Sequence, residues 1–134
     1  MASFARIERD GGERFHSLRR DLDASSLGIN VITLAPGQRG RIHAHETQEE
    51  LYLVLEGRLT LVLDGGPREL AADEIARVPP EVRRQLANDS DSPVVILALG
   101  ATGEHVGRDG LAWESFEDDG PGRPPQEVPA PPEP

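Results

Sequence analysis

The residues best suited to chemistry lie in one short segment, RIHAHETQEELYLVLEG, residues 41–57. His43 and His45 are separated by a single residue, and Glu50 follows shortly after them. Alternate side chains of a β-strand point to the same face, so a strand here aims both imidazoles in one direction. Two imidazoles and one carboxylate form a ligand set that suits Fe, Mn, Ni, Zn or Co and leaves coordination positions open. The spacing therefore predicts a divalent metal site at His43, His45 and Glu50, although such histidine pairs also occur in strands that bind no ion.

Short strands are predicted to position these residues. ELYLVLEG and RLTLVLDGG are apolar runs joined at Gly57, and the second run ends at Asp64-Gly65-Gly66, a pattern that predicts a β-hairpin. Both faces of the two runs are apolar, so a second sheet or a second subunit must cover them. Short strands punctuated by glycine, proline, asparagine and aspartate favour an all-β sandwich or barrel. Further strands are predicted in three segments: residues 30–37, 74–80 and 93–100.

The chain is predicted to form one domain, with a different composition at its C-terminal end. A length of 134 residues suits a single hydrophobic core. Residues 1–25 are expected to supply an edge strand or a helical turn, and residues 26–117 to form the β-barrel. From Gly120 onward the sequence is rich in proline and has little to bury, so residues 118–134 are predicted to be a disordered tail.

The charge and composition disfavour several classes of partner. The net charge is −10, with 24 acidic against 14 basic residues, and such a surface repels nucleic acid and anionic lipid. No segment has the roughly 20 apolar residues needed to cross a bilayer. The absence of cysteine excludes disulfides and thiolate metal sites. We therefore expect a cytoplasmic protein with no nucleic acid or membrane partner, and the doubly apolar hairpin predicts a homodimer.

The segment around the histidines resembles a known motif. Five residues have the types and spacing of the first conserved motif of the cupin superfamily: Gly37, His43, His45, Glu50 and Gly57. The resemblance covers about residues 27–100. It implies a small antiparallel β-barrel of the jelly-roll type, with a metal ion in its interior. It also implies dioxygenase, isomerase, epimerase or decarboxylase activity, among which the fold does not select.

The second cupin motif is only partly present in DEIARVPPEVRRQLAN. Pro79 and Asn88 match it, whereas Asp73 and Glu81 replace its two glycines. Arg84 stands where the family has a histidine, its fourth metal ligand. Arginine keeps its charge and cannot ligate a cation. At about 6 Å and an effective dielectric constant near 20, it repels a divalent ion by roughly 5 kcal/mol.

Three interpretations of Arg84 follow. In the first, the metal is bound at His43, His45 and Glu50, and Arg84 binds a carboxylate or phosphate of a small anionic metabolite beside it. In the second, Arg84 pairs with Glu50, the metal is absent, and the barrel is a non-catalytic binding module. In the third, Arg84 turns outward, and Gln85 approaches the site through a local bulge.

Two functions therefore remain open, a metal-dependent enzyme and a metal-free module that binds a small molecule or a protein. Tyr52 has the same strand parity as Glu50 and is a candidate to line the cavity, where it contacts a ligand or makes a single hydrogen bond in the core. An aromatic content of 4% leaves little surface for stacking against sugar rings. His16 and His105 lie outside the motif and are expected at the surface.

Overall fold

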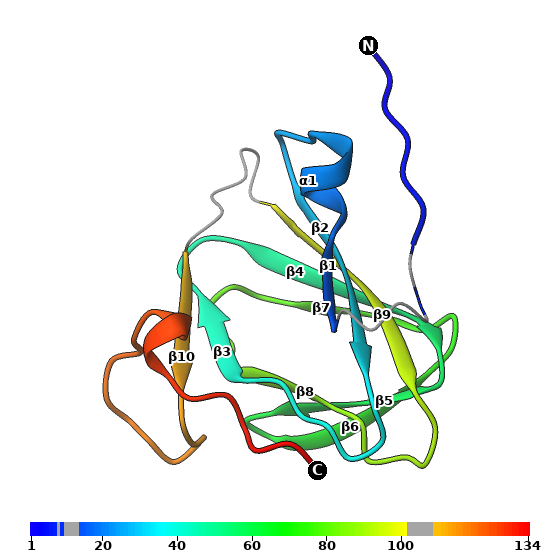
Figure 1. Cartoon of the computed structure of the whole chain (residues 1–134). Helices are drawn as coiled ribbons and strands as arrows, with labels where there is room; N and C mark the ends of the chain where they lie inside the picture. Colours follow the sequence, from blue (N-terminus) through cyan, green and yellow to red (C-terminus); the bar gives the residue numbers. More distant parts are fainter. Residues whose placement is uncertain (8, 10–13, 102–108) are drawn as a thin grey trace.

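Two antiparallel sheets of five strands each form the domain (Figure 1), as seen in a computed structural model that describes residues 1–7, 9, 14–101 and 109–134. The first sheet contains, in spatial order, β1 (Phe15–Ser17), β2 (Gly28–Leu34), β9 (Val94–Ala101), β4 (Glu49–Glu56) and β7 (Ile75–Val78). The second contains β10 (Gly110–Trp113), β3 (Ile42–His45), β8 (Arg84–Ala87), β5 (Arg58–Leu63) and β6 (Gly66–Ala71). The prediction of a small antiparallel β-barrel is confirmed.

The joint at Gly57 is not the hairpin that the sequence predicted. β4 pairs with β7 and β9, whereas β5 pairs with β6 and β8, so Gly57 carries the chain from one sheet to the other. Gly57 has a φ of 81°, and a Cβ there would lie 2.3 Å from the carbonyl oxygen of Pro93. Only glycine fits this corner without strain. The hairpin is instead formed by β5 and β6, where Leu63 pairs with Gly66.

The apolar core lies between the two sheets. Tyr52 and Val54 of β4 are 1% and 0% exposed, and Leu59 and Leu61 of β5 face them from the opposite sheet. The same core cluster includes Leu34, Leu86, Val94, Ile96 and Ala98. The inward faces of β4 and β5 are therefore covered by the opposite sheet, as the doubly apolar pattern required.

The outer face of the first sheet is covered by the N-terminal part of the same chain. Helix α1 (Leu18–Leu22) follows β1 directly, and Ser17 caps it by accepting a hydrogen bond from the backbone N–H of Arg20. Leu18 packs with Val31 of β2 and Val95 of β9, and Leu55 of β4 adjoins this cluster. Both expectations for this segment, an edge strand and a helical turn, are present. The chain thus supplies part of the cover that motivated the homodimer, which stays a prediction.

Residues 118–134, here called the C-terminal segment, lie against the barrel rather than extending freely. Arg123 pairs with Ala112 of β10, and a single turn of 3-10 helix, η1 (Pro125–Glu127), follows beside β10 (Figure 1). Val128 is 2% exposed, and its carbonyl accepts a hydrogen bond from Arg41 Nε at 3.0 Å. The structure differs here from the expected flexible tail because one buried valine and a few backbone hydrogen bonds anchor the prolines. Among the described residues, no helix is long and apolar enough to span a membrane.

Candidate metal centre and cavity

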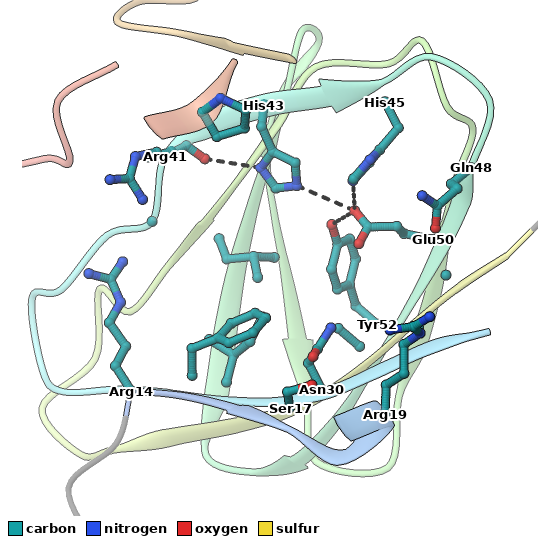
Figure 2. Close-up of a pocket in the computed structure, with 18 of the residues that line it drawn as sticks. Arg14, Ser17, Arg19, Asn30, Arg41, His43, His45, Gln48, Glu50 and Tyr52 are labelled. Atoms are coloured by element: carbon teal, nitrogen blue, oxygen red, sulfur yellow. Dashed lines mark hydrogen bonds and ion pairs between the residues drawn. The ribbon is translucent and has the colours of Figure 1, made fainter. Parts of the chain in front are cut away.

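The three predicted ligands converge inside the barrel. β3 presents His43 and His45 on one face, and Glu50 lies at the start of β4, the next strand in the chain, which belongs to the opposite sheet. Their ligand atoms all lie within 4.8 Å of one another. Glu50 Oε1 is 3.3 Å from His43 Nε2 and 3.0 Å from His45 Nε2 (Figure 2). The expected convergence of two nitrogen ligands and one oxygen ligand is confirmed.

Both imidazoles are held through the ring nitrogen that faces away from this point. His43 Nδ1 lies 3.2 Å from the carbonyl oxygen of Arg41, which can only accept, so Nδ1–H donates in this hydrogen bond. His45 Nδ1 lies 2.7 Å from Asp109 Oδ1. A hydrogen bond to the distal nitrogen fixes the tautomer and the ring orientation of a metal-binding histidine. The hydrogen bonds at Nδ1 thus direct Nε2 of both rings toward the point where an ion would bind.

Asp109 is a site residue that the sequence did not reveal. Its side chain is 5% exposed, and Oδ2 accepts hydrogen bonds from the backbone N–H groups of Thr47 and Gln48 at 3.0 and 2.9 Å. Burial alone would raise the pKa of Asp109, but the hydrogen bonds from Thr47, His45 and Gln48 outweigh it and lower the pKa. Asp109 is therefore a carboxylate that orients His45. Its only sequence signal is the loop GRDG, which has no fixed spacing to the histidines.

Replacing Asp109 by asparagine is expected to weaken metal binding about 10- to 100-fold, the usual effect of losing a hydrogen-bond partner of a ligand histidine. Asparagine keeps the shape of the side chain but not the charge that favours His45 Nδ1–H. Calorimetric titration of Zn²⁺ or Mn²⁺ into both proteins measures the change. Asp91→Asn, at an exposed loop position, is the matched control and should leave the affinity unchanged. Equal affinities in Asp109→Asn and the control would contradict the role given to Asp109.

The charges at the centre depend on one another. Burial would raise the pKa of Glu50, but hydrogen bonds and charge interactions with His43 and His45 lower it well below its ordinary value of 4.5. Burial also works against the charged form of His45, yet Glu50 and Asp109 together raise its pKa above 6.5. Without a metal, the two carboxylates therefore favour the charged form of the His45 ring.

Tyr52 reinforces Glu50. The phenol is 1% exposed and donates a hydrogen bond of 2.5 Å to Glu50 Oε1. Burial, followed by the negative charge of Glu50, raises the pKa of Tyr52 well above 10.0, so the hydroxyl stays protonated. Tyr52 also lines the cavity, as its strand parity predicted. In this structure its hydroxyl has Glu50 as its hydrogen-bond partner.

Arg84 points inward beneath the centre, which contradicts the interpretation that turned it to solvent. It pairs directly with His43 across β3 and β8. Its side chain is 0% exposed, and Nη2 lies 3.6 Å from Glu50 Oε1. The guanidinium donates to four backbone carbonyls, those of Val78, Pro79, Pro80 and Val82.

These contacts leave Arg84 no access to a ligand in the cavity. Gln85 is also directed elsewhere, since its Nε2 donates to the carbonyl of Gly40 at 3.0 Å. Neither residue is among the described residues that line the cavity. The proposed anion contact at Arg84 and the proposed approach of Gln85 therefore find no support in this geometry.

A cavity of about 630 Å³ opens beside the three ligands. Its volume lies in the range of sites for small molecules. Leu34, Leu86 and Ala98 form part of its apolar wall and also belong to the core. Its charged lining, apart from the ligands, consists of Arg14, Arg19 and Arg41, none of which the sequence had singled out. Figure 2 shows Arg14 and Arg41 on the side of the cavity opposite Glu50.

The other two histidines lie apart from the centre or outside the described residues. His16 is 8% exposed, and its Nε2 lies 2.5 Å from Asp21 Oδ2, so the expectation of a surface position was wrong for this residue. It lies on edge strand β1, where it pairs with Val31 of β2. His105 falls outside the residues that the structure describes.

Comparison with known proteins identifies one family. The family described as Cupin_2, a cupin domain, matches residues 30–100, which include all three ligands. Among curated proteins, an uncharacterised protein of Methanocaldococcus jannaschii is 33% identical over 61 residues, which are 46% of this chain and 49% of that protein. Polyketide synthase CurC of Streptomyces cyaneus is 35% identical over 68 residues, 51% of this chain and 44% of that protein. The alignments thus span about half the length of these relatives.

Solved structures share the fold of this chain. A cupin protein from Bacteroides fragilis superposes with a TM-score of 0.65 at 24% identity, covering 76% of this chain and 86% of that chain. A sugar phosphate isomerase from a cupin superfamily, from Silicibacter pomeroyi, gives a TM-score of 0.66 at 26% identity and covers 87% of this chain and 76% of that chain.

Proposed function

Because this chain belongs to the cupin domain family, we propose that it binds a divalent metal ion through His43, His45 and Glu50 and holds a small anionic metabolite in the adjoining cavity. The observation that carries the proposal is the orientation of the two imidazoles. Each presents Nε2 to Glu50 Oε1, while Nδ1 is held by the Arg41 carbonyl or by Asp109. Two histidines and one carboxylate suit Fe, Mn, Ni, Zn or Co.

The residues of the chain divide the work at this site. A bound divalent ion would supply Lewis acidity toward an oxygen atom of the metabolite. Tyr52 donates to Glu50 and fixes its orientation, and Asp109 fixes that of His45. Leu34 and Leu86 give the cavity an apolar wall, and a low local dielectric constant strengthens the electrostatic interactions beside it.

The charge of the cavity supports an anionic metabolite. Three arginines line it, and Glu50 is the only carboxylate among its described lining residues. In a chain of net charge −10, this is a local reversal of sign that attracts anions. The likeness to a sugar phosphate isomerase, which acts on an anionic substrate by its name, agrees with this choice.

One observation favours a second candidate, a metal-free binding module. Arg84 Nη2 lies 3.6 Å from Glu50 Oε1, so a fixed positive charge occupies one side of the centre. In that case Glu50 serves as the partner of Arg84 and of protonated His45, and the cavity binds its ligand without chemistry.

Metal analysis separates these two functions. We expect one divalent ion per chain in protein prepared without a nickel column, and less than about a tenth of that content in His43→Ala, because two remaining ligands hold such ions weakly. His16→Ala is the matched control, since that histidine pairs with Asp21 away from the cavity. Wild-type protein that takes up no Fe²⁺, Mn²⁺, Ni²⁺, Zn²⁺ or Co²⁺ on dialysis would refute the metal proposal and favour the module. Equal metal in wild type and His43→Ala would place the ion elsewhere.

A further inference from the structure

Two arginines at the cavity are each held by one backbone carbonyl and keep their other donors. Arg14 Nη2 donates to the carbonyl of Arg39 at 2.8 Å, and Arg41 Nε donates to that of Val128 at 3.0 Å. An arginine has five N–H donors, so four remain on each side chain. No other side-chain hydrogen bond of these two arginines is found among the described residues. One hydrogen bond therefore orients each guanidinium group, and its other N–H donors remain available to a ligand.

These arginines also lack the carboxylate partners that half of the arginines of the chain have. Arg39, Arg58, Arg77, Arg84 and three further arginines lie within 4.0 Å of a carboxylate. Within the described part of the chain, no carboxylate lies that close to Arg14, Arg19 or Arg41. Arg19 Nε is buried without a hydrogen-bond partner there. An acidic chain thus leaves its cavity arginines uncompensated, which favours a ligand that brings negative charge.

The positions of these groups give the cavity two chemically different ends. Figure 2 shows Arg14 and Arg41 on one side and His45, Glu50 and Gln48 on the other. Arg14 comes from the segment before β1, and its Nη2 adjoins Gly40, next to Arg41 in the chain. The two arginine side chains therefore lie on the same side of the cavity, opposite Glu50 (Figure 2).

We propose that Arg14 and Arg41 form a subsite for the phosphate of a phosphate monoester, whose oxygen-bearing other end reaches His43, His45 and Glu50. The contact of the other end with His43, His45 and Glu50 rests on the proposed function, whereas the phosphate subsite does not. Two guanidinium forks match the several terminal oxygens of a phosphate, and a dianion offsets the charge of two arginines where a carboxylate offsets one. Arg19 adds a third positive charge to the wall.

The C-terminal segment takes part in this subsite. Val128 supplies the carbonyl that orients Arg41, and Pro125 lines the cavity. A Cβ placed on Gly110 would lie 3.3 Å from Pro125 and 3.8 Å from His45, so Pro125 comes near the metal centre as well. The C-terminal segment therefore contacts both parts of the cavity, orienting Arg41 through Val128 and lying near His45 through Pro125.

Calorimetric titration with inorganic phosphate tests the subsite, both in metal-loaded protein and after removal of metal by a chelator. Arg14→Gln and Arg41→Gln should each weaken phosphate binding about 10-fold, and the double variant about 100-fold or more, because each removes charge-assisted hydrogen bonds. The metal content of all three variants should equal that of wild type. Arg58→Gln, an exposed arginine on β5, is the matched control and should bind phosphate as wild type does.

The outcomes distinguish this subsite from the metal centre. Phosphate binding that the arginine variants weaken, in a protein without metal, supports the subsite while the proposed metal fails. Undetectable phosphate binding in wild type, or equal binding in the double variant, overturns the subsite whatever the metal content. Acetate that binds as tightly as phosphate overturns the assignment to a phosphate. Loss of metal together with phosphate in the double variant also counts against it, because the two ends are then not separate.

Discussion

Replacing Arg84 by alanine is expected to lower the free energy of unfolding by about 3 to 5 kcal/mol, the usual result of removing one partner from a buried ionic network. Its guanidinium is 0% exposed and donates to the carbonyls of Val78, Pro79, Pro80 and Val82. Alanine removes one hydrogen bond from each of these carbonyls and opens a cavity beneath Glu50, while the carbonyls of Pro79 and Pro80 keep the backbone N–H donors of Val82 and His45. Each lost hydrogen bond adds to the loss of stability. Such a change is a large part of the total stability of a small domain.

Urea denaturation of the metal-free proteins measures this effect. Arg84→Lys should fall between wild type and Arg84→Ala, because an ammonium group has three donors and cannot span the four carbonyls. Arg58→Ala on the adjacent β5 is the control, since it breaks an exposed ion pair with Glu69 and should cost less than about 1 kcal/mol. If Arg84→Ala unfolds at the same urea concentration as Arg58→Ala, Arg84 does not hold the connection between β7 and β8.

Metal binding is expected to weaken about tenfold for each pH unit below the pKa of His45, because the ion must displace the proton on that ring. Burial opposes the charged ring, but Glu50 and Asp109 raise this pKa above the ordinary value of 6.5. The loss therefore begins at a higher pH than for an isolated histidine. Asp109→Asn removes one of the two carboxylates and should move the loss to lower pH. Calorimetric titrations of Zn²⁺ across the pH range, in buffers of different ionisation enthalpy, measure both the affinity and the proton released.

The free energy of unfolding of the metal-free protein should also depend on pH, through His45 and Glu50. A raised folded-state pKa of His45 contributes stability that is present below 6.5 and is lost as the pH rises through the folded-state pKa. A lowered pKa of Glu50 contributes stability that is present above 4.5 and is lost as the pH falls through its folded-state value. The increase in Tm caused by metal should thus grow as the pH rises through the His45 transition. A metal affinity that is flat with pH would contradict the proton on His45.

The ligand set could be predicted from the sequence because it depends on local periodicity. His43 and His45 share a face by strand alternation, and Glu50 lies at the start of the next strand in the chain after a short turn. The inward direction of Arg84 agrees with the motif spacing. Its contacts did not follow from that spacing, because a long side chain reaches carbonyls several residues away. The spacing of a motif predicts which backbone positions lie close together, but it does not predict the contacts of a long, flexible arginine side chain.

Features that join distant segments could not be predicted in this way. Asp109 meets His45 across 64 residues of sequence, and Arg14 meets Arg39 across 25. Gly57 marks a sharp joint equally well in a hairpin and in a corner between sheets, and only the strand pairing distinguishes them. The C-terminal segment has a low apolar content, so the burial of Val128 could not be predicted from the sequence.

The stretch that matches the family runs from residue 30 to residue 100, yet part of the cavity lining lies outside it. Arg14, Arg19 and Pro125 line the cavity from beyond those limits, and Asp109, which orients His45, lies beyond them as well. The lining of the cavity can therefore differ between proteins that share the matched stretch. Two such proteins with near-identical barrels could accept different compounds, and sequence identity within the barrel alone is a poor guide to what each one recognises.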